Sequence, residues 1–241
     1  MTRRRIDRFL ATLAAELRVP ARAYVTGAAA AALWGRVRPS LDIDLGLELR
    51  PPARRTAKSA SLKSRPPATW EAIEAAVART TALTSIPASA AEDIDRWGMI
   101  TLLDYRRTSR LYRRFDRLEV RLLDPRNWAI GKLTRYLDPD VRDVAEVFRR
   151  QGVDAKAAAR LWGRALRASP ASTAQFQFRQ HVELFLQRES RHIWGKTFAF
   201  TDAIAVFHRA AGIRDAGAGS PAVPPFRPPG GSRPGRSRSA G

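Results

Sequence analysis

The segment of residues 22–45 constrains the fold more than any other part of the chain. Residues 22–26 form a short apolar run that is typical of a strand. Gly27 then allows a tight backbone turn, and the alanines of residues 28–33 favour a closely packed helix. Residues 41–45 alternate apolar and acidic side chains, which is again a strand pattern. The sequence therefore predicts a strand–helix–strand unit.

Two aspartates lie on the second strand of this unit. Successive side chains of a strand point to opposite faces, so Asp42 and Asp44 share a face. Carboxylate oxygens are the ligands that Mg²⁺ prefers. A surface strand can also carry two acids for purely structural reasons. The helix that begins at Gly27 favours the metal site, because a helix N-terminus binds phosphate groups.

Apolar spacing along the rest of the chain predicts further helices and two more strands. The expected helices cover residues 6–17, 70–82, 125–136, 140–149, 155–167 and 174–191, and the expected strands cover residues 97–105 and 118–123. In the later strand, the apolar side chains are expected on one face and the charged ones on the other. The elements together predict an α+β fold, a mixed β-sheet with flanking helices followed by a small helical region.

We expect three regions along the chain. Residues 1–150 are expected to form one domain and residues 151–212 a C-terminal helical region. Residues 213–241, rich in Gly, Pro, Ser and Arg, are expected to be a disordered basic tail. Residues 50–67 contain no acid and many Pro and Ser residues, and they predict a mobile loop.

The charge balance and the residue types narrow the classes of function. The chain of 241 residues has no cysteine, which excludes disulfides, thiolate catalysis and Cys-type zinc sites. No apolar run reaches the length of a membrane span and the N-terminus lacks a signal-peptide core, so we expect a cytoplasmic protein that binds no membrane. The net charge of +20 favours a polyanionic partner, although a compositional bias toward arginine explains it equally simply.

One cluster of arginines is interleaved with aromatic and apolar residues: Arg106, Arg107, Arg110, Arg113 and Arg114, among Tyr105, Leu111 and Tyr112. Such a surface could hold RNA through phosphate contacts and stacking. The alternative is a solvated basic helix or hairpin.

The first strand–helix–strand unit resembles the minimal nucleotidyltransferases of the polymerase-β-like superfamily. Their motif is an apolar strand ending in Gly-Gly or Gly-Ser, a helix, and Asp-x-Asp within a second apolar strand. Residues 24–28 and 41–45 match this motif. The departure is Ala28, which replaces the usual second Gly or Ser and offers no hydroxyl group to a triphosphate.

A second resemblance is to the branch of AbiE-type toxins and related bacterial nucleotidyltransferase-like proteins. In that branch a strand is followed by a helix with a lysine and then by Asp-x-x-Asp. Residues 118–123, the helix that contains Lys132, and the pair Asp140 and Asp143 look like this arrangement. The resemblance covers roughly the first 150 residues.

The resemblance implies transfer of a nucleoside monophosphate from a nucleoside triphosphate, with two magnesium ions as cofactor. Asp42 and Asp44 would be catalytic and metal-binding. A third carboxylate is expected from Asp104, which matches the order of the family pattern, or from Glu119, which shares a charged strand face. Gly27, Ala28 and Lys132 are expected to bind the nucleotide.

Three of these residues have a simpler alternative role. Lys132 is expected either to contact the triphosphate or to be only solvated, because a lysine on a helix is usually exposed to solvent. Asp140 and Asp143, one helical turn apart, brace Lys132 or Arg135, or they face solvent.

The leading hypothesis is a magnesium-dependent nucleotidyltransferase acting on an RNA or protein hydroxyl, as the toxin of a toxin–antitoxin or phage-defence system with an antitoxin protein as partner. The second is an inactive nucleotidyltransferase fold that binds RNA or protein. An enzyme that modifies small aminoglycoside-type molecules is the third, and the basic composition argues against the acidic acceptor cleft that it would need.

Overall fold

The computed structural model describes residues 1–35, 41–49, 70–92 and 94–213. Its main element is a five-stranded mixed sheet with the strand order β3-β2-β1-β7-β6. The strands are β1 (Ala21–Thr26), β2 (Ile43–Leu49), β3 (Ala88–Ala91), β6 (Arg110–Phe115) and β7 (Leu118–Leu122). The central strand β1 pairs antiparallel with β2 and parallel with β7. The protein therefore has the predicted α+β class. The loop predicted over residues 50–67 and the tail from residue 214 lie outside the described residues.

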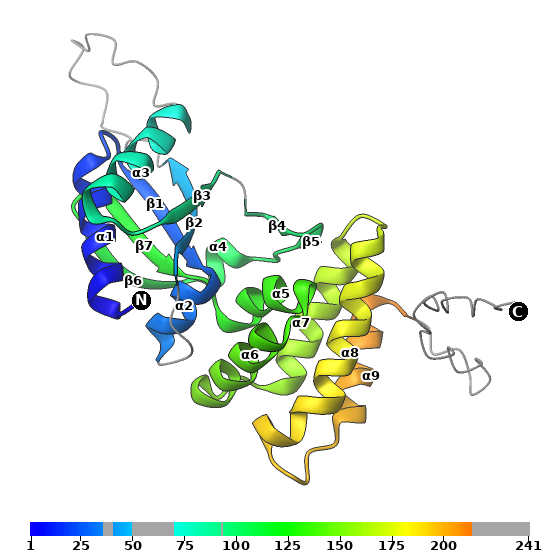
Figure 1. Cartoon of the computed structure of the whole chain (residues 1–241). Coiled ribbons are helices and arrows are strands. Elements are labelled where there is room, and N and C mark those ends of the chain that lie inside the picture. Colours follow the sequence, from blue (N-terminus) through cyan, green and yellow to red (C-terminus); the bar gives the residue numbers. More distant parts are fainter. Residues whose placement is uncertain (36–40, 50–69, 93, 214–241) are drawn as a thin grey trace, which may run out of the picture.

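The sheet has one apolar and one polar face, as the alternation in its strands predicts. Val25, Leu45 and Val120 belong to the apolar face and are buried. Two helices, α1 (Arg3–Glu16) and α3 (Trp70–Thr84), cover this face and pack against each other (Figure 1). The polar face lies toward the second half of the chain.

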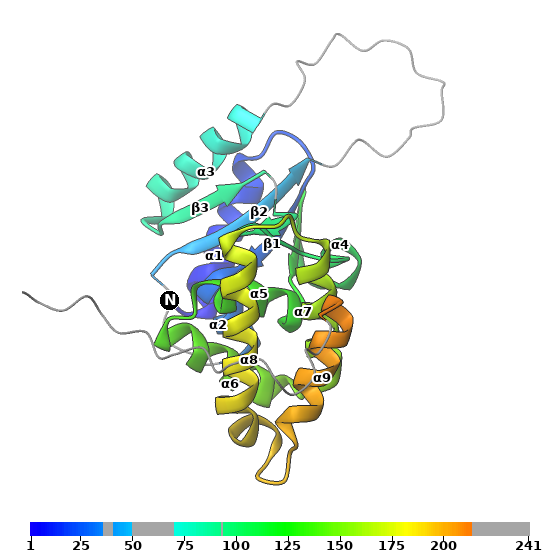
Figure 2. The same ribbon diagram turned by 90° about the vertical axis from the view of Figure 1, so that its right-hand side faces the viewer.

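The second half of the chain is a group of packed helices: α5 (Pro125–Arg135), α6 (Asp138–Gln151), α7 (Ala155–Ala168), α8 (Thr173–Trp194) and α9 (Phe200–Ala211). Figure 2, turned from Figure 1, shows them below the sheet, with α2 (Gly27–Trp34) between the two parts. Helices α7 and α9 cross closely, since a Cβ atom on Gly163 would lie 2.4 Å from the carbonyl oxygen of Phe207. Because α5 and α6 pack with α7 and α8, residues 125–151 belong spatially to the helical group.

The strand predicted over residues 97–105 is wrong. This segment forms a short hairpin whose two strands have two residues each, β4 (Arg96–Trp97) and β5 (Ile100–Thr101). The single helical turn α4 (Tyr105–Thr108) follows. The positive φ angles of Gly98, Met99 and Asp104 break the extended backbone. Two of the apolar residues that suggested a strand, Ile100 and Leu102, are nevertheless buried, whereas Met99 is exposed.

In the described part of the chain, no helix combines the length and the apolar character that crossing a membrane requires.

Candidate active site at the β1–α2 corner

The predicted corner between β1 and α2 forms around Gly27, beside the carboxylate of Asp44. Thr26 pairs with Asp44 across the two strands, so both lie at the same end of the sheet. Gly27 has φ +60°, and a Cβ atom built on it would lie 1.9 Å from Asp44 Oδ2. Only glycine fits this position, because any side chain would displace the carboxylate. Asp42 lies just before β2 and is exposed. Ala28 is half-buried in the first turn of α2.

Helix α5 is attached directly to this corner. The indole Nε1 of Trp128 donates a 2.8 Å hydrogen bond to the carbonyl oxygen of Gly27. The Trp128 ring also packs edge-on against Trp34, at the end of α2, with 5.1 Å between ring centroids. An aromatic side chain on a helix is expected in the core, and Trp128 is indeed only 1% exposed. It therefore fixes the turn that contacts Asp44.

The carboxyl group of Asp44 is poorly stabilised as an anion. Burial, followed by the charge of Asp42, raises its pKa above the ordinary value. The positive charges of Arg135 and Lys132 act in the opposite direction but do not outweigh burial. Among the described residues, none donates a hydrogen bond to this carboxylate. A bound cation would relieve both the burial of the charge and the repulsion between the two aspartates, so the pair fits a hard divalent ion.

Lys132 forms a buried ion cluster with helix α6. Its Nζ atom donates to Asp140 Oδ1 at 2.7 Å and to Asp143 Oδ2 at 2.8 Å, and all three residues are about 2% exposed. Arg135 donates to the other oxygen of Asp140 at 3.0 Å. The two aspartates therefore brace Lys132 and Arg135, and the solvent-facing alternative is wrong, as is a merely solvated Lys132.

The pKa of Asp140 shifts in the opposite direction to that of Asp44. Burial alone would raise it, but the hydrogen bonds and charges of Arg135 and Lys132 outweigh burial and hold the pKa below its ordinary value. The cluster thus holds its cations in fixed positions on the side of α5 that influences Asp44.

A third carboxylate does not join the Asp42–Asp44 pair in the described part of the chain. No three His, Cys, Asp or Glu side chains gather there in an arrangement that could hold a metal ion. The residues paired with Asp44 on the neighbouring strands are Thr26 and Ser89, both hydroxyl residues. Asp104 lies at the start of α4, exposed, with ion pairs of 3.2 Å to Arg107 and 3.9 Å to Arg164.

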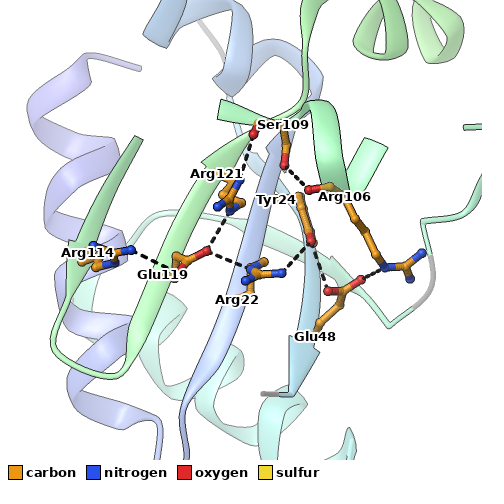
Figure 3. A network of polar contacts seen from close by, with 8 residues as sticks. All are labelled: Arg22, Tyr24, Glu48, Arg106, Ser109, Arg114, Glu119 and Arg121. Atoms are coloured by element: carbon orange, nitrogen blue, oxygen red, sulfur yellow. Dashed lines mark hydrogen bonds and ion pairs between the residues drawn. The ribbon is translucent and has the colours of Figure 1, made fainter. Parts of the chain in front are cut away.

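Glu119, the alternative third carboxylate, belongs to a different network on the polar sheet face (Figure 3). Its Oε1 accepts hydrogen bonds from Arg121 at 2.7 Å and from Arg22 at 2.9 Å, and Arg114 lies 3.7 Å from Oε2. The hydrogen bond from Arg121 is the main reason that the pKa of Glu119 lies below its ordinary value. Glu119 pairs with Arg22, four residues before Thr26 along β1, so it lies well away from the corner.

The predicted arginine cluster is distributed over two faces of the sheet. Arg106 contacts Glu48 and Asp95 beside the polar face. Arg114 also lies on that face, opposite Glu119, whereas Arg113 lies on the face covered by α1 and contacts Asp7. Residues 110–115 form a hairpin rather than a helix, because β6 pairs antiparallel with β7.

Comparison of the chain with protein-family models, curated proteins and solved structures gives no match. The resemblance to nucleotidyltransferases therefore depends on the residues themselves.

Sequence reasoning assigned no functional role to two residues at the corner: Arg135 was considered only as an ion-pair partner of Asp140 and Asp143, and Trp128 only as a core residue. Arg135 is one helical turn after Lys132, and this spacing was the available signal. The indole hydrogen bond of Trp128 has no local signal, because its acceptor lies 101 residues earlier.

Proposed function

We propose that the chain is a nucleotidyltransferase that moves a nucleoside monophosphate from a nucleoside triphosphate to a hydroxyl group of RNA or protein. The observation that carries the proposal is the contact of the Asp44 carboxylate with Gly27, at the N-terminus of α2. This contact brings a carboxylate suited to magnesium next to backbone N–H groups suited to phosphate.

Each residue of the corner has a definable part in this reaction. Asp42 and Asp44 would hold the magnesium ions, which supply charge stabilisation to the attacking and leaving oxygens. Gly27 and Ala28 would present the first N–H groups of α2 to the triphosphate. Lys132 is held between two carboxylates, and its charge acts on the corner from a fixed position. Arg135 is 46% exposed and can contact a phosphate directly.

The proposed reaction is an in-line displacement at the α-phosphorus. The acceptor hydroxyl oxygen forms a bond to the α-phosphorus, its proton passes to a base or to water, and the bond to the bridging oxygen breaks. Pyrophosphate leaves with the electron pair of that bond. The identity of a third carboxylate, Asp104 or Glu119, stays a prediction, and so do the antitoxin partner and the toxin–antitoxin or phage-defence setting.

The test is label transfer from each of four α-labelled triphosphates, with magnesium and a cell extract as the source of acceptor. We expect labelled RNA or protein with the native chain and none with Asp42→Asn, an exposed and isosteric substitution. Digestion of the product by ribonuclease or protease identifies the acceptor. An Asp42→Asn protein that transfers label at the native rate would refute the proposed role of the pair. In the same assay, an active Asp104→Ala protein would exclude Asp104 as the third ligand.

The second function is an inactive nucleotidyltransferase fold that binds RNA or protein. Three observations favour it: Ala28 lacks a hydroxyl group, Lys132 is already held by two carboxylates, and no group of three carboxylates gathers in the described residues. Absence of transfer with all four triphosphates, together with retained RNA or protein binding, would support this function over the first.

A further inference from the structure

A groove between α1 and β6 brings together residues from distant parts of the sequence. Its cavity of about 380 Å³ is lined by Arg3 and Asp7 of α1 and by Tyr112 and Arg113 of β6. Figure 1 shows α1 and β6 side by side near the N-terminus. Arg113 pairs with Val120, on the sheet face that α1 covers. The groove therefore opens on the opposite side of the sheet from Asp44 and is separate from the proposed active site.

The lining side chains hold each other in place. The Tyr112 hydroxyl donates to Asp7 Oδ1 at 2.7 Å, and Arg113 donates to Asp7 Oδ2 at 3.2 Å. Arg3 donates to the Tyr112 hydroxyl at 3.1 Å, and its guanidinium lies 5.3 Å from the centre of the Tyr112 ring. The Asp7 carboxylate thus orients Arg113 directly and Arg3 through the Tyr112 hydroxyl, and the groove keeps a net positive charge.

The positive charge extends beyond the groove along both elements. The surrounding exposed arginines are Arg4, Arg5 and Arg8 on α1, Arg110 on β6 and Arg117 in the turn after β6. The exposed acid of this region is Asp116, which pairs with Arg117 at 3.6 Å. The surface formed by the groove and these five arginines, hereafter the α1–β6 surface, is therefore strongly basic.

We propose that the α1–β6 surface binds the phosphate backbone of a nucleic acid strand. Protein partners usually bury an apolar, charge-depleted centre. The large apolar side chain exposed on β6 is Leu111 alone among the described residues of that strand, at 46%. Nucleic-acid interfaces are instead polar and strongly positive, and arginines bind phosphate oxygens through paired hydrogen bonds. The residues present match the second kind of partner.

The binding does not depend on nucleotidyl transfer, so the two proposals can fail separately. Asp42→Asn, which is expected to abolish transfer, should leave binding at the α1–β6 surface unchanged. Loss of binding in that variant would overturn the assignment of a separate site.

The test is fluorescence anisotropy of the full chain with labelled single-stranded RNA and DNA of about 20 nucleotides, at salt concentrations from about 50 to about 200 mM. The double variant Arg3→Gln/Arg113→Gln should bind about tenfold more weakly, and the slope of log affinity against log salt should fall by about 1.4, or about 0.7 for each phosphate that is no longer neutralised. The matched control is Arg160→Gln/Arg191→Gln, which removes two exposed arginines from α7 and α8. An equal loss of affinity in both double variants would show general charge attraction and overturn the proposal.

A gain-of-binding variant excludes misfolding as the explanation. Asp7→Asn removes the one acid of the groove and keeps its shape, so we expect tighter RNA binding than in the native chain. Unchanged or weaker binding would count against the proposal. Competition with poly-glutamate of equal charge completes the test. Displacement of RNA at equal charge concentration would identify an acidic protein as the partner and overturn the nucleic-acid assignment. Equal affinities for RNA and DNA would show that the surface binds the phosphate backbone, as proposed.

Discussion

Asp44 at the end of the sheet and Asp140 on α6 both interact with the positive charges of Lys132 and Arg135, yet the pKa values of their carboxyl groups shift in opposite directions. Asp140 receives hydrogen bonds from both Lys132 and Arg135, and these outweigh its burial. Asp44 interacts with the same cations only through space, and its burial and the nearby Asp42 dominate. The difference between Asp44 and Asp140 therefore lies in direct hydrogen bonds to the carboxylate, rather than in proximity to positive charge. A structural carboxylate and a carboxylate poised to bind a cation therefore lie next to each other.

The largest expected effect comes from removing the shared cation of the buried cluster. Lys132→Met leaves Asp140 and Asp143 without their ammonium partner, and breaking a buried ion pair in this way costs about 3–5 kcal/mol. Urea unfolding measures the loss. Arg135→Met is the matched control, because Arg135 is 46% exposed, and we expect a loss of about 1 kcal/mol. A Lys132→Met protein as stable as this control would contradict the buried cluster.

Asp140→Asn should cost about 1–3 kcal/mol at neutral pH, because it weakens the hydrogen bonds to two charged donors. Since the folded-state pKa of Asp140 is lowered, its contribution to stability is present above its ordinary pKa and is lost as the pH falls through the lowered value. Urea unfolding from pH 7 downward should therefore show the native and variant proteins converging below about pH 4. A difference that stays constant over this range would refute the assignment.

Gly27→Ala tests the contact that confines Asp44. The new Cβ would lie 1.9 Å from Asp44 Oδ2 and would also be strained at φ +60°. Gly152→Ala is the matched control: its φ is +58° and nothing lies within 4 Å of the new Cβ. We expect a loss of about 1 kcal/mol for the control and about 2 kcal/mol or more for Gly27→Ala, measured by thermal unfolding. Label transfer should disappear in Gly27→Ala alone. Equal behaviour of the two variants would show that the carboxylate adjusts freely.

The smallest expected effect has the opposite sign. Asp44→Asn should raise the stability of the metal-free protein by about 1 kcal/mol at neutral pH, or about 2–4 °C in Tm. A raised folded-state pKa means that stability from the protonated carboxyl is present at low pH and is lost as the pH rises. The gain of the variant should therefore vanish in acid. Asp42→Asn, at an exposed position, should change stability by less than about 0.5 kcal/mol. A destabilised Asp44→Asn protein would contradict the comparison.

The sequence predicted the elements whose signals are local. The turn predicted at Gly27 between β1 and α2 is confirmed, because the signals for it, a glycine and the alternating strand residues, lie within a few positions of the turn. Helix α5 was correct because Asp124 caps it and Pro125 begins it. The separation of apolar and charged faces on β7 was also correct.

The errors concern segments whose structure depends on distant contacts. The short strand β3, of sequence Ala-Ser-Ala-Ala, has no β-branched residue and was missed, since pairing with β2 determines it. Helix α9 was not predicted either, although it packs closely on α7. The residues at 97–105 have the apolar content of a strand, but a hairpin and a single helical turn bury Ile100, Leu102 and Tyr105 instead.

Only those residues of the candidate site that are close together in the sequence were predicted. Gly27 and Asp44 meet across one turn, as a strand–helix–strand unit implies, whereas Asp42, which was expected on the same strand, lies just before β2. The role of Asp140 and Asp143 could not be read from the spacing, because their partner Lys132 is on another helix and a surface pair would have the same spacing. Asp104 matched the order of the family pattern, yet its ion pairs are with Arg107 and Arg164.

The hydrogen bond from Trp128 to the Gly27 carbonyl has a mechanical consequence. The groups of the corner come from two bodies, since Asp44 is on β2, with Asp42 just before it, and Lys132 and Arg135 are on α5. This bond crosses the joint between them at the turn itself, beside the contact of the Trp128 ring with Trp34. A small rotation of the helices against the sheet would therefore change the distance between the carboxylates and the cations before it changed either body internally. A molecule that contacts both groups would act as a clamp across the joint.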